Sequence, residues 1–108
     1  MSEIEAVNYN ELYEIGKKLI NYSSFIKESL NKIDNYMKCL EDNTIWNGES
    51  KKAIIHKYFA EREQLNLLYL QLVQYSKTIL ETVLVSEDLS IKASKILENL
   101  NETLLWQS

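Results

Sequence analysis

The sequence predicts an all-α protein, a helix-turn-helix hairpin of two long antiparallel helices. Three observations indicate this fold. The 108-residue chain has no proline and only two glycines, apolar residues recur at alternating steps of three and four, and one cluster of turn-forming residues interrupts that pattern. Because proline and glycine are the residues that most often end helices, long helices can run uninterrupted here. We expect one domain covering residues 1–108.

The first helix is expected over about residues 3–42. Ser2 and Glu5 match a capping box, in which a hydroxyl and a carboxylate bond to backbone N–H groups at a helix start. A coiled-coil-like apolar seam, interrupted at one position, follows along the helix. Its members are Leu12, Ile15, Leu19, Tyr22, Ile26, Ile33, Tyr36 and Leu40. Acid-before-base pairs four residues apart, such as Asp34 and Lys38, predict a solvated face.

The turn is expected over about residues 43–49, where turn formers and N-cap residues gather. Its Asn-Gly pair is also typical of a β-hairpin, but both flanks carry helical patterns. The second helix is expected over about residues 50–104. Ser86 and the acidic residues after it can cap a restart, so this helix either runs on or bends near residue 86. Its seam consists of Leu65, Tyr69, Leu72, Ile79 and Val83.

These apolar seams predict a partner. Two such helices make only one mutual interface in a lone hairpin, and much of each apolar stripe would stay in water. Contiguous exposed apolar surface usually marks an interaction site, so we expect two hairpins to pair into a four-helix bundle. The seam residues of both helices are the predicted partner interface. They carry no clear charge code, which leaves homodimer and heterodimer both open.

Composition disfavours several classes of function. The net charge of -4 disfavours nucleic acid and anionic lipid as partners. The longest apolar runs are far shorter than the roughly 20 residues of a membrane span, and the start of the chain does not match a secretory signal peptide. Cys39 and His56 are the only residues of their types. We therefore expect no disulfide, no metal or cofactor site and no catalytic residues, and hence no enzyme.

Trp46-Asn47-Gly48, placed between two long helices in a chain of about a hundred residues, resembles the Trp-x-Gly motif of the WXG (ESAT-like) family of small type VII secretion proteins. The resemblance covers nearly the whole chain. Family members also tend to carry a Tyr-x-x-x-Asp/Glu signal near the end of the second helix. Its best match here runs from Leu84 to Asp88, with leucine in place of the aromatic residue. The resemblance implies a secretion-signal-like motif made of Trp46, Gly48, Leu84 and Asp88.

The resemblance also implies partners and a location. The protein would fold in the cytoplasm of a Gram-positive-type cell and pair with itself or with a related WXG- or LXG-type helical protein. A secretion ATPase would then export the folded complex to the medium or the cell surface. In a second version, the chain is a small companion of a larger LXG-type toxin and pairs with the helical N-terminal region of that toxin.

Two further interpretations of the sequence stay open. Leu104, Leu105 and Trp106 near the C-terminus either pack on the bundle or form a docking tail. The alternative function is a cytosolic helical adaptor, regulator or immunity-type binding protein, in which the Trp-x-Gly sequence is accidental and the apolar faces recognise another helix. Location distinguishes the two functions, because only the first requires export through the secretion ATPase.

Overall fold

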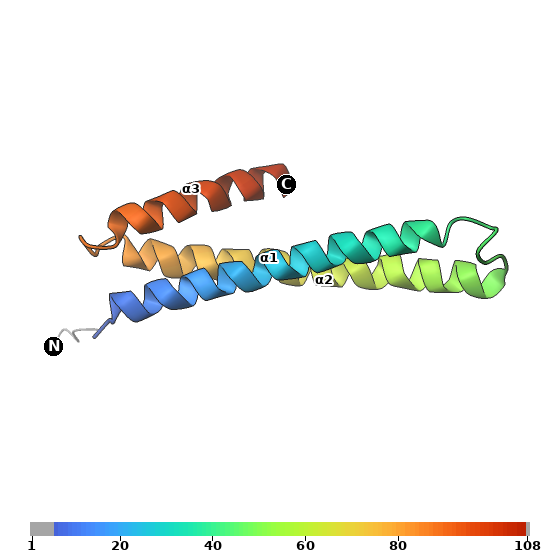
Figure 1. Ribbon diagram of the computed structural model, residues 1–108. Coiled ribbons are helices and arrows are strands. Elements are labelled where there is room, and N and C mark those ends of the chain that lie inside the picture. The colour runs from blue at the N-terminus through green and yellow to red at the C-terminus, as the bar shows by residue number, and fades with distance from the viewer. Residues whose placement is uncertain (1–5, 108) are drawn as a thin grey trace. The chain divides into compact units, whose positions relative to one another are not determined.

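The protein consists of α-helices and turns throughout residues 6–107, the part of the chain that the computed structural model describes (Figure 1). Helix α1 spans Tyr9–Cys39, α2 spans Glu49–Val83 and α3 spans Ser90–Gln107. Side chains are described as far as residue 102. The all-α class expected from the sequence is confirmed. Where one long second helix was expected, the chain forms two.

Helix α1 begins at Tyr9, later than the expected start near residue 3. Asn8 caps it: the backbone N–H of Glu11 donates to Asn8 Oδ1 at 3.1 Å, and the N–H of Leu12 donates to the Asn8 carbonyl at 3.0 Å. An asparagine side chain in this position satisfies a backbone donor that the first helical turn leaves unpaired. The capping box expected at the start of the chain lies outside the described residues.

Residues 84–89 break the second helical stretch. The Ser86 carbonyl accepts hydrogen bonds from the N–H of Leu89 at 3.3 Å and of Ser90 at 2.9 Å, while the Ser86 N–H donates to the Val83 carbonyl at 3.0 Å. These bonds close one helix and open the next. The region that the sequence marked for a bend near residue 86 is therefore a turn between two separate helices.

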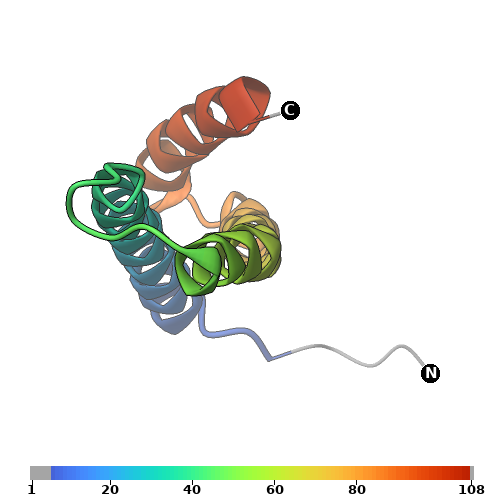
Figure 2. The same ribbon diagram turned by 90° about the vertical axis from the view of Figure 1, so that its right-hand side faces the viewer.

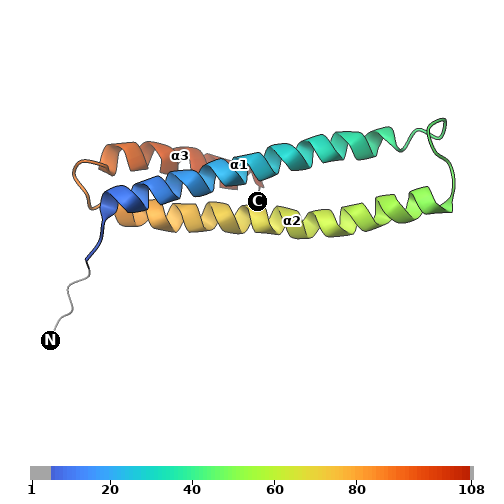
Figure 3. The same ribbon diagram turned by 60° about the horizontal axis from the view of Figure 1, so that its bottom comes forward.

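The chain divides into two compact units. Unit 1 comprises Met1–Asn21 and Leu72–Ser108, and unit 2 comprises Tyr22–Gln71. In unit 1, α3 runs beside the first part of α1 and the last part of α2 (Figure 3). Its core contains Tyr13, Val73, Leu80, Val83, Leu89, Ala93, Leu97 and Leu100. Unit 1 is thus a three-helix arrangement with an apolar core.

In unit 2, the last part of α1 and the first part of α2 form an antiparallel hairpin. Residues 40–48 connect the two helices, and Figure 2 shows this connection from its own end of the hairpin. Leu30 and Tyr69 are the only buried hydrophobic side chains of this unit, whose residues are all described. Unit 2 therefore has a much smaller apolar core than unit 1.

Gly16 lets α1 approach α2 closely in unit 1. A Cβ atom at Gly16 would lie 2.9 Å from Cδ2 and 3.0 Å from Cγ of Leu80, closer than real Cβ contacts. Leu80 is fully buried and cannot move aside freely. The glycine is therefore required by helix packing, although glycine costs a helix about 1 kcal/mol relative to alanine.

Replacing Gly16 with valine should lower the free energy of unfolding by about 1–3 kcal/mol, because the added side chain overpacks the contact with Leu80. Ser24→Val is the matched control, since Ser24 is exposed on the same helix. The control should change stability by less than about 0.5 kcal/mol. Urea denaturation followed by circular dichroism at one protein concentration measures both, and equal stability of the two variants would contradict the packing role.

Candidate partner interface

A polar cluster holds the hairpin of unit 2 together. Asp34 on α1 accepts hydrogen bonds from Nε and Nη2 of Arg62 on α2, at 2.7 and 2.8 Å. The Tyr58 hydroxyl donates to the same carboxylate. The side chains of Asp34 and Arg62 are each 21% exposed, so the ion pair is largely shielded from solvent. A bidentate pair of this kind fixes both the distance and the orientation of two helices.

The cluster shifts the pKa of each member. The hydrogen bonds from Arg62 hold the pKa of Asp34 below its ordinary value, and those from Tyr58 act in the same direction. The carboxylate in turn raises the pKa of Arg62. Burial, and then the bond to Asp34, raises the pKa of Tyr58. Asp34 therefore pairs with Arg62 across the hairpin, and not with Lys38 on a solvated face as the sequence suggested.

Other polar groups line the same helix-helix contact in unit 2. Lys27 Nζ lies 5.3 Å from the centroid of the Tyr69 ring, a cation–π contact between α1 and α2. Asn66 is half-buried, and its buried Oδ1 has no hydrogen-bond partner within the described residues. The inner side of this hairpin is thus unusually polar for a coiled-coil-like seam.

The expected apolar seam of α1 lies one residue away from the stripe that faces α2. Gly16 and Asp34 contact α2, whereas their neighbours Ile15 and Ile33 belong to the expected seam and are exposed. One residue is a rotation of about 100° around a helix. Within the expected seam, Ile15, Tyr22, Ile33 and Tyr36 are exposed and Leu12, Leu19, Ile26 and Leu40 are half-buried. Four of the eight seam residues are therefore open as a partner interface, and the other four are partly covered within the chain.

The expected seam of α2 divides differently. Leu65 is exposed, and Leu72 and Ile79 are half-buried. Tyr69 and Val83 are buried inside units 2 and 1, respectively. These two residues were expected at the partner interface, and the structure corrects this because their side chains already pack within the chain.

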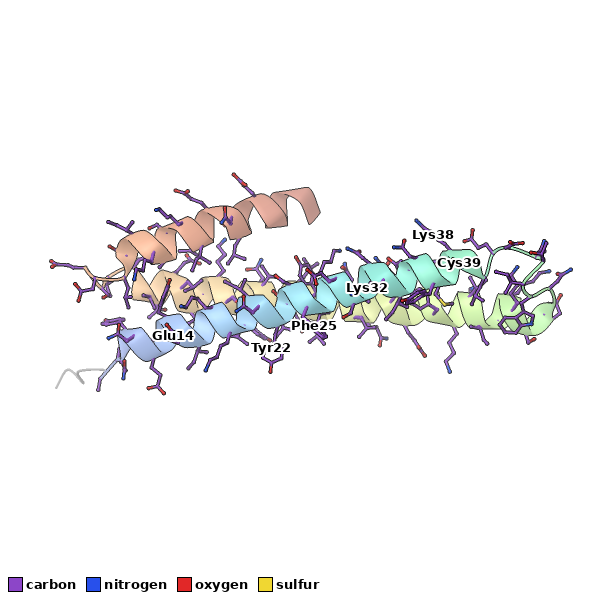
Figure 4. The ribbon with its side chains drawn as sticks, in the orientation of Figure 1. Glu14, Tyr22, Phe25, Lys32, Lys38 and Cys39 are labelled. Carbon is purple, nitrogen blue, oxygen red and sulfur yellow. The ribbon has the colours of Figure 1, made fainter. Side chains whose placement is uncertain are left out.

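A subset of the open apolar residues of unit 2 forms what we call the docking face. It consists of Tyr22, Phe25, Ile26, Ile33 and Tyr36 on α1 and of Ile54, Leu65 and Leu68 on α2. Tyr22 and Tyr36 are 67% and 70% exposed. Figure 4 shows Tyr22 and Phe25 projecting from the same side of α1. Exposed aromatic and aliphatic side chains in such number are unusual unless another surface covers them.

Helix geometry places both halves of the docking face on one side of the hairpin. On each helix its residues precede residues of the inner contact, as Ile33 precedes Asp34 and Leu68 precedes Tyr69. The two helices run in opposite directions, so the residue before an inner-contact residue points to the same side of the hairpin on both helices. Unit 1 shows the same relation, because Ile15 and Ile79 precede the contacting residues Gly16 and Leu80 and line one open groove.

The Trp-x-Gly sequence lies in the connection between α1 and α2, in unit 2. Trp46 is partly exposed and its neighbour Ile45 is 62% exposed. Gly48 has a φ of 151°, a backbone conformation that favours glycine. No atom lies within 4 Å of the position that a Cβ at Gly48 would occupy. The glycine of the motif is therefore explained by backbone conformation and not by lack of space.

Polar side chains hold this connection in place. Oδ1 of Asp42 accepts hydrogen bonds from the N–H and the hydroxyl of Thr44 at 2.9 and 2.8 Å, and these bonds hold the pKa of Asp42 below its ordinary value. Nζ of Lys51 donates to Oδ1 of Asn43 at 2.8 Å, and Lys51 is only 6% exposed. These bonds hold residues 42–44 of the connection, and one of them joins this part to α2.

The remaining expected site residues lie in unit 1. Leu84 and Asp88 are exposed in the turn between α2 and α3, and Asp88 lines a surface hollow with Ser86, Asn8 and Tyr9. Two residues of the signal-like motif thus lie in each unit, and each pair is close in the sequence. The expected docking tail belongs to α3, but the side chains of residues 104–106 lie outside the described ones.

Groups that could bind a metal ion do not gather in the described part of the chain. Among its residues, no set of three or more His, Cys, Asp or Glu side chains could hold a metal ion. His56 and Cys39 are both exposed.

No helix within the described residues is long and apolar enough to cross a membrane.

Comparison of the chain with protein-family models, curated proteins and solved structures found no match. The function of the chain is therefore inferred from its own residues and their arrangement.

The Asp34–Arg62 pair should contribute stability that depends on pH. Arg62→Met should lower the free energy of unfolding by about 1–3 kcal/mol at neutral pH, because it leaves a shielded carboxylate without its charged partner. Lys57→Met is the control, since Lys57 forms only an exposed pair with Glu61 at 3.9 Å. This control should cost less than about 1 kcal/mol.

The acid dependence gives a second readout for the same pair. Folding lowers the pKa of Asp34, so its contribution is complete above the ordinary value of about 4 and is lost as the pH falls through the lowered value. The stability difference between wild type and Arg62→Met should therefore shrink below about pH 4. Urea denaturation at several pH values measures this, and a difference that stays constant down to about pH 2 would contradict it.

Gly48→Ala should lower the free energy of unfolding by about 1–2 kcal/mol, because alanine adopts the φ of 151° only under strain. Asn47→Ala, next to it in the chain, should have a smaller effect. Thermal unfolding of both variants measures the difference. A Gly48→Ala variant as stable as wild type would show that the loop conformation does not depend on glycine.

Proposed function

We propose that this chain is a helical partner protein of a type VII secretion system, exported as a substrate or together with a WXG- or LXG-type helical protein. One observation carries the proposal: Trp46-Asn47-Gly48 lies in the connection between two long antiparallel helices. This is the place that the motif has in the family the sequence resembles. The backbone at Gly48 gives the motif glycine a physical reason as well.

The loop itself supports a recognition role. A tryptophan buries a large area on contact, and partly exposed tryptophans are common at the centre of binding interfaces. Trp46 and the exposed Ile45 are presented on a connection that the Lys51–Asn43 hydrogen bond ties to α2. A preorganised loop loses little conformational entropy when a receptor binds it. We assign to Trp46 the contact with the secretion machinery.

The docking face supports the pairing step. Its apolar side chains lie along one stripe of each helix, with steps of three, four, seven or eleven residues along the stripe, and another helix can pack against such a surface. This favours a helical partner over an extended peptide. Covering this face removes exposed side chains such as Tyr22, Phe25 and Tyr36 from water. Pairing therefore stabilises the hairpin of unit 2, whose own core is small.

The sequence of events requires no chemistry from the chain itself. The protein folds in the cytoplasm, and its docking face closes against a helical partner. The secretion ATPase then recognises the paired form through the Trp46 loop, with Asp88 as the acidic element of the signal. Energy for transport comes from the ATPase, and the chain supplies shape and recognition. Pairing precedes export because an open docking face would favour aggregation in the cytoplasm.

Export should depend on Trp46. In a host that carries the secretion system, the wild-type protein should accumulate in the culture medium only when the ATPase is intact. Trp46→Ala should reduce export at least about tenfold while leaving pairing intact, since loss of a central tryptophan costs about 2 kcal/mol or more. Ile45→Ala is the matched control in the same loop and should be exported normally. Immunoblots of medium and cell fractions measure all three.

Two results would contradict the proposal. Protein that stays in the cell fraction of the ATPase-positive strain would favour the cytosolic adaptor or immunity-type function. Equal export of the Trp46→Ala variant and wild type would show that the Trp-x-Gly sequence is not the signal. A cytosolic marker protein in the same samples distinguishes export from lysis.

A further inference from the structure

In unit 2, the hydrogen bonds between α1 and α2 converge on the carboxylate of Asp34. This carboxylate accepts two bonds from Arg62, at 2.7 and 2.8 Å, and one from Tyr58. Leu30 and Tyr69 are the only buried hydrophobic side chains of this unit, whose residues are all described. Burial of apolar surface is the main term that holds packed helices together, and unit 2 has little of it. The closed hairpin therefore depends strongly on one carboxylate.

The closed hairpin also carries a cost that water would remove. The Oδ1 atom of Asn66 is buried and has no hydrogen-bond partner within the described residues. A buried acceptor without a partner has lost its hydrogen bond to water and gained none in exchange. Separation of α1 from α2 in unit 2 would return that bond to Asn66, while Asp34 and Arg62 would exchange their mutual contact for hydration. Opening thus sets the loss of one polar cluster and little apolar contact against the rehydration of one amide.

Unit 1 is held together by different contacts. Its buried hydrophobic side chains come from all three helices, and Gly16 on α1 lies in close contact with Leu80 on α2. Proteins open locally in cooperative units, and units with few buried apolar contacts open at a lower cost in free energy. Separation of α1 from α2 is therefore more costly in unit 1 than in unit 2.

We propose that Asp34, Tyr58 and Arg62 form a latch, and that the hairpin of unit 2 opens and closes while unit 1 stays folded. In the open state, Asp34 releases Arg62 and Tyr58, and the two helical segments of unit 2 separate. Most helical stability in proteins comes from tertiary packing, so these segments fray once they are apart. The three helices of unit 1 remain packed. The latch does not depend on the proposed function, because it acts within a single chain.

Hydrogen exchange of backbone amides in the purified full-length protein, followed by mass spectrometry, tests the latch. In the wild type, the amides of residues 25–39 and 50–69 should exchange at least about tenfold faster than those of residues 73–83 and 90–100, because only the first group is exposed by the local opening. At a raised pH where exchange is faster than closing, peptides from unit 2 should show two separate mass populations, and peptides from unit 1 should show one.

Asp34→Asn removes the charge and should release the latch. Exchange in unit 2 should become at least about tenfold faster, because a neutral amide is a much weaker acceptor for Arg62 than a carboxylate. Exchange in unit 1 should change by less than about twofold. Glu61→Gln is the matched control, since it makes the same change in unit 2 at an exposed residue that pairs with Lys57 at 3.9 Å. This control should exchange like the wild type.

Asn66→Leu tests the opposite direction. Leucine removes the unpaired buried acceptor and adds apolar contact between the helices, so exchange in unit 2 should become at least about fivefold slower. Asn31→Leu is the matched control, because it makes the same change at an exposed position of α1 in unit 2. It should change exchange by less than about twofold. Circular dichroism checks that the variants keep their helical content.

Three results would overturn the latch. Equal exchange in the two units, in the wild type or in Asp34→Asn, would show that the chain opens as one cooperative body. Wild-type exchange in Asp34→Asn would show that the carboxylate does not hold the hairpin closed. Equal effects of Asn66→Leu and Asn31→Leu would show that the buried amide does not favour opening. The wild-type and Asn66→Leu measurements decide the question even where Asp34→Asn does not fold.

Discussion

The contact between Asp34 and Arg62 determines which side of α1 faces α2 in unit 2. A bidentate ion pair has a narrow range of acceptable geometries, and Tyr58 adds a third hydrogen bond to the same carboxylate. Once these groups occupy the inner side of the hairpin, the apolar residues one position earlier must turn outward. The exposed docking face is therefore the stripe that lies one residue before the inner contact on each helix.

The inner contact between α1 and α2 is apolar in unit 1 and polar in unit 2. Unit 1 has an apolar inner contact, in which Gly16 allows close approach to Leu80, and α3 contributes further apolar side chains such as Leu97. Unit 2 has a polar inner contact and keeps most of its large apolar side chains on the surface. Burial of apolar surface is the main favourable term in folding. Unit 2 thus lacks the apolar stabilisation that unit 1 obtains from its own third helix.

This division is consistent with the recognition function that we propose. The hairpin that carries Trp46 in its connection also carries the docking face, so pairing and presentation of the loop belong to the same unit. Stabilising the hairpin through its open face also stabilises the base of the loop, where Lys51 holds Asn43. In the function we propose, a paired chain would consequently present the Trp46 loop in a more ordered state than an unpaired one.

The sequence by itself determined the helical class and the position of the turn around Trp46, because apolar period and turn chemistry are local properties. It marked the region near Ser86 as one where the second helix either runs on or bends. It also identified the apolar stripe that contains Ile33. It could not show that Asp34 meets Arg62, since a charge four residues before a lysine has the same local pattern as a solvated pair. The choice between two adjacent stripes of α1 was decided only by the tertiary structure, because ion pairs and close contacts such as Gly16–Leu80 join residues that are far apart in the chain.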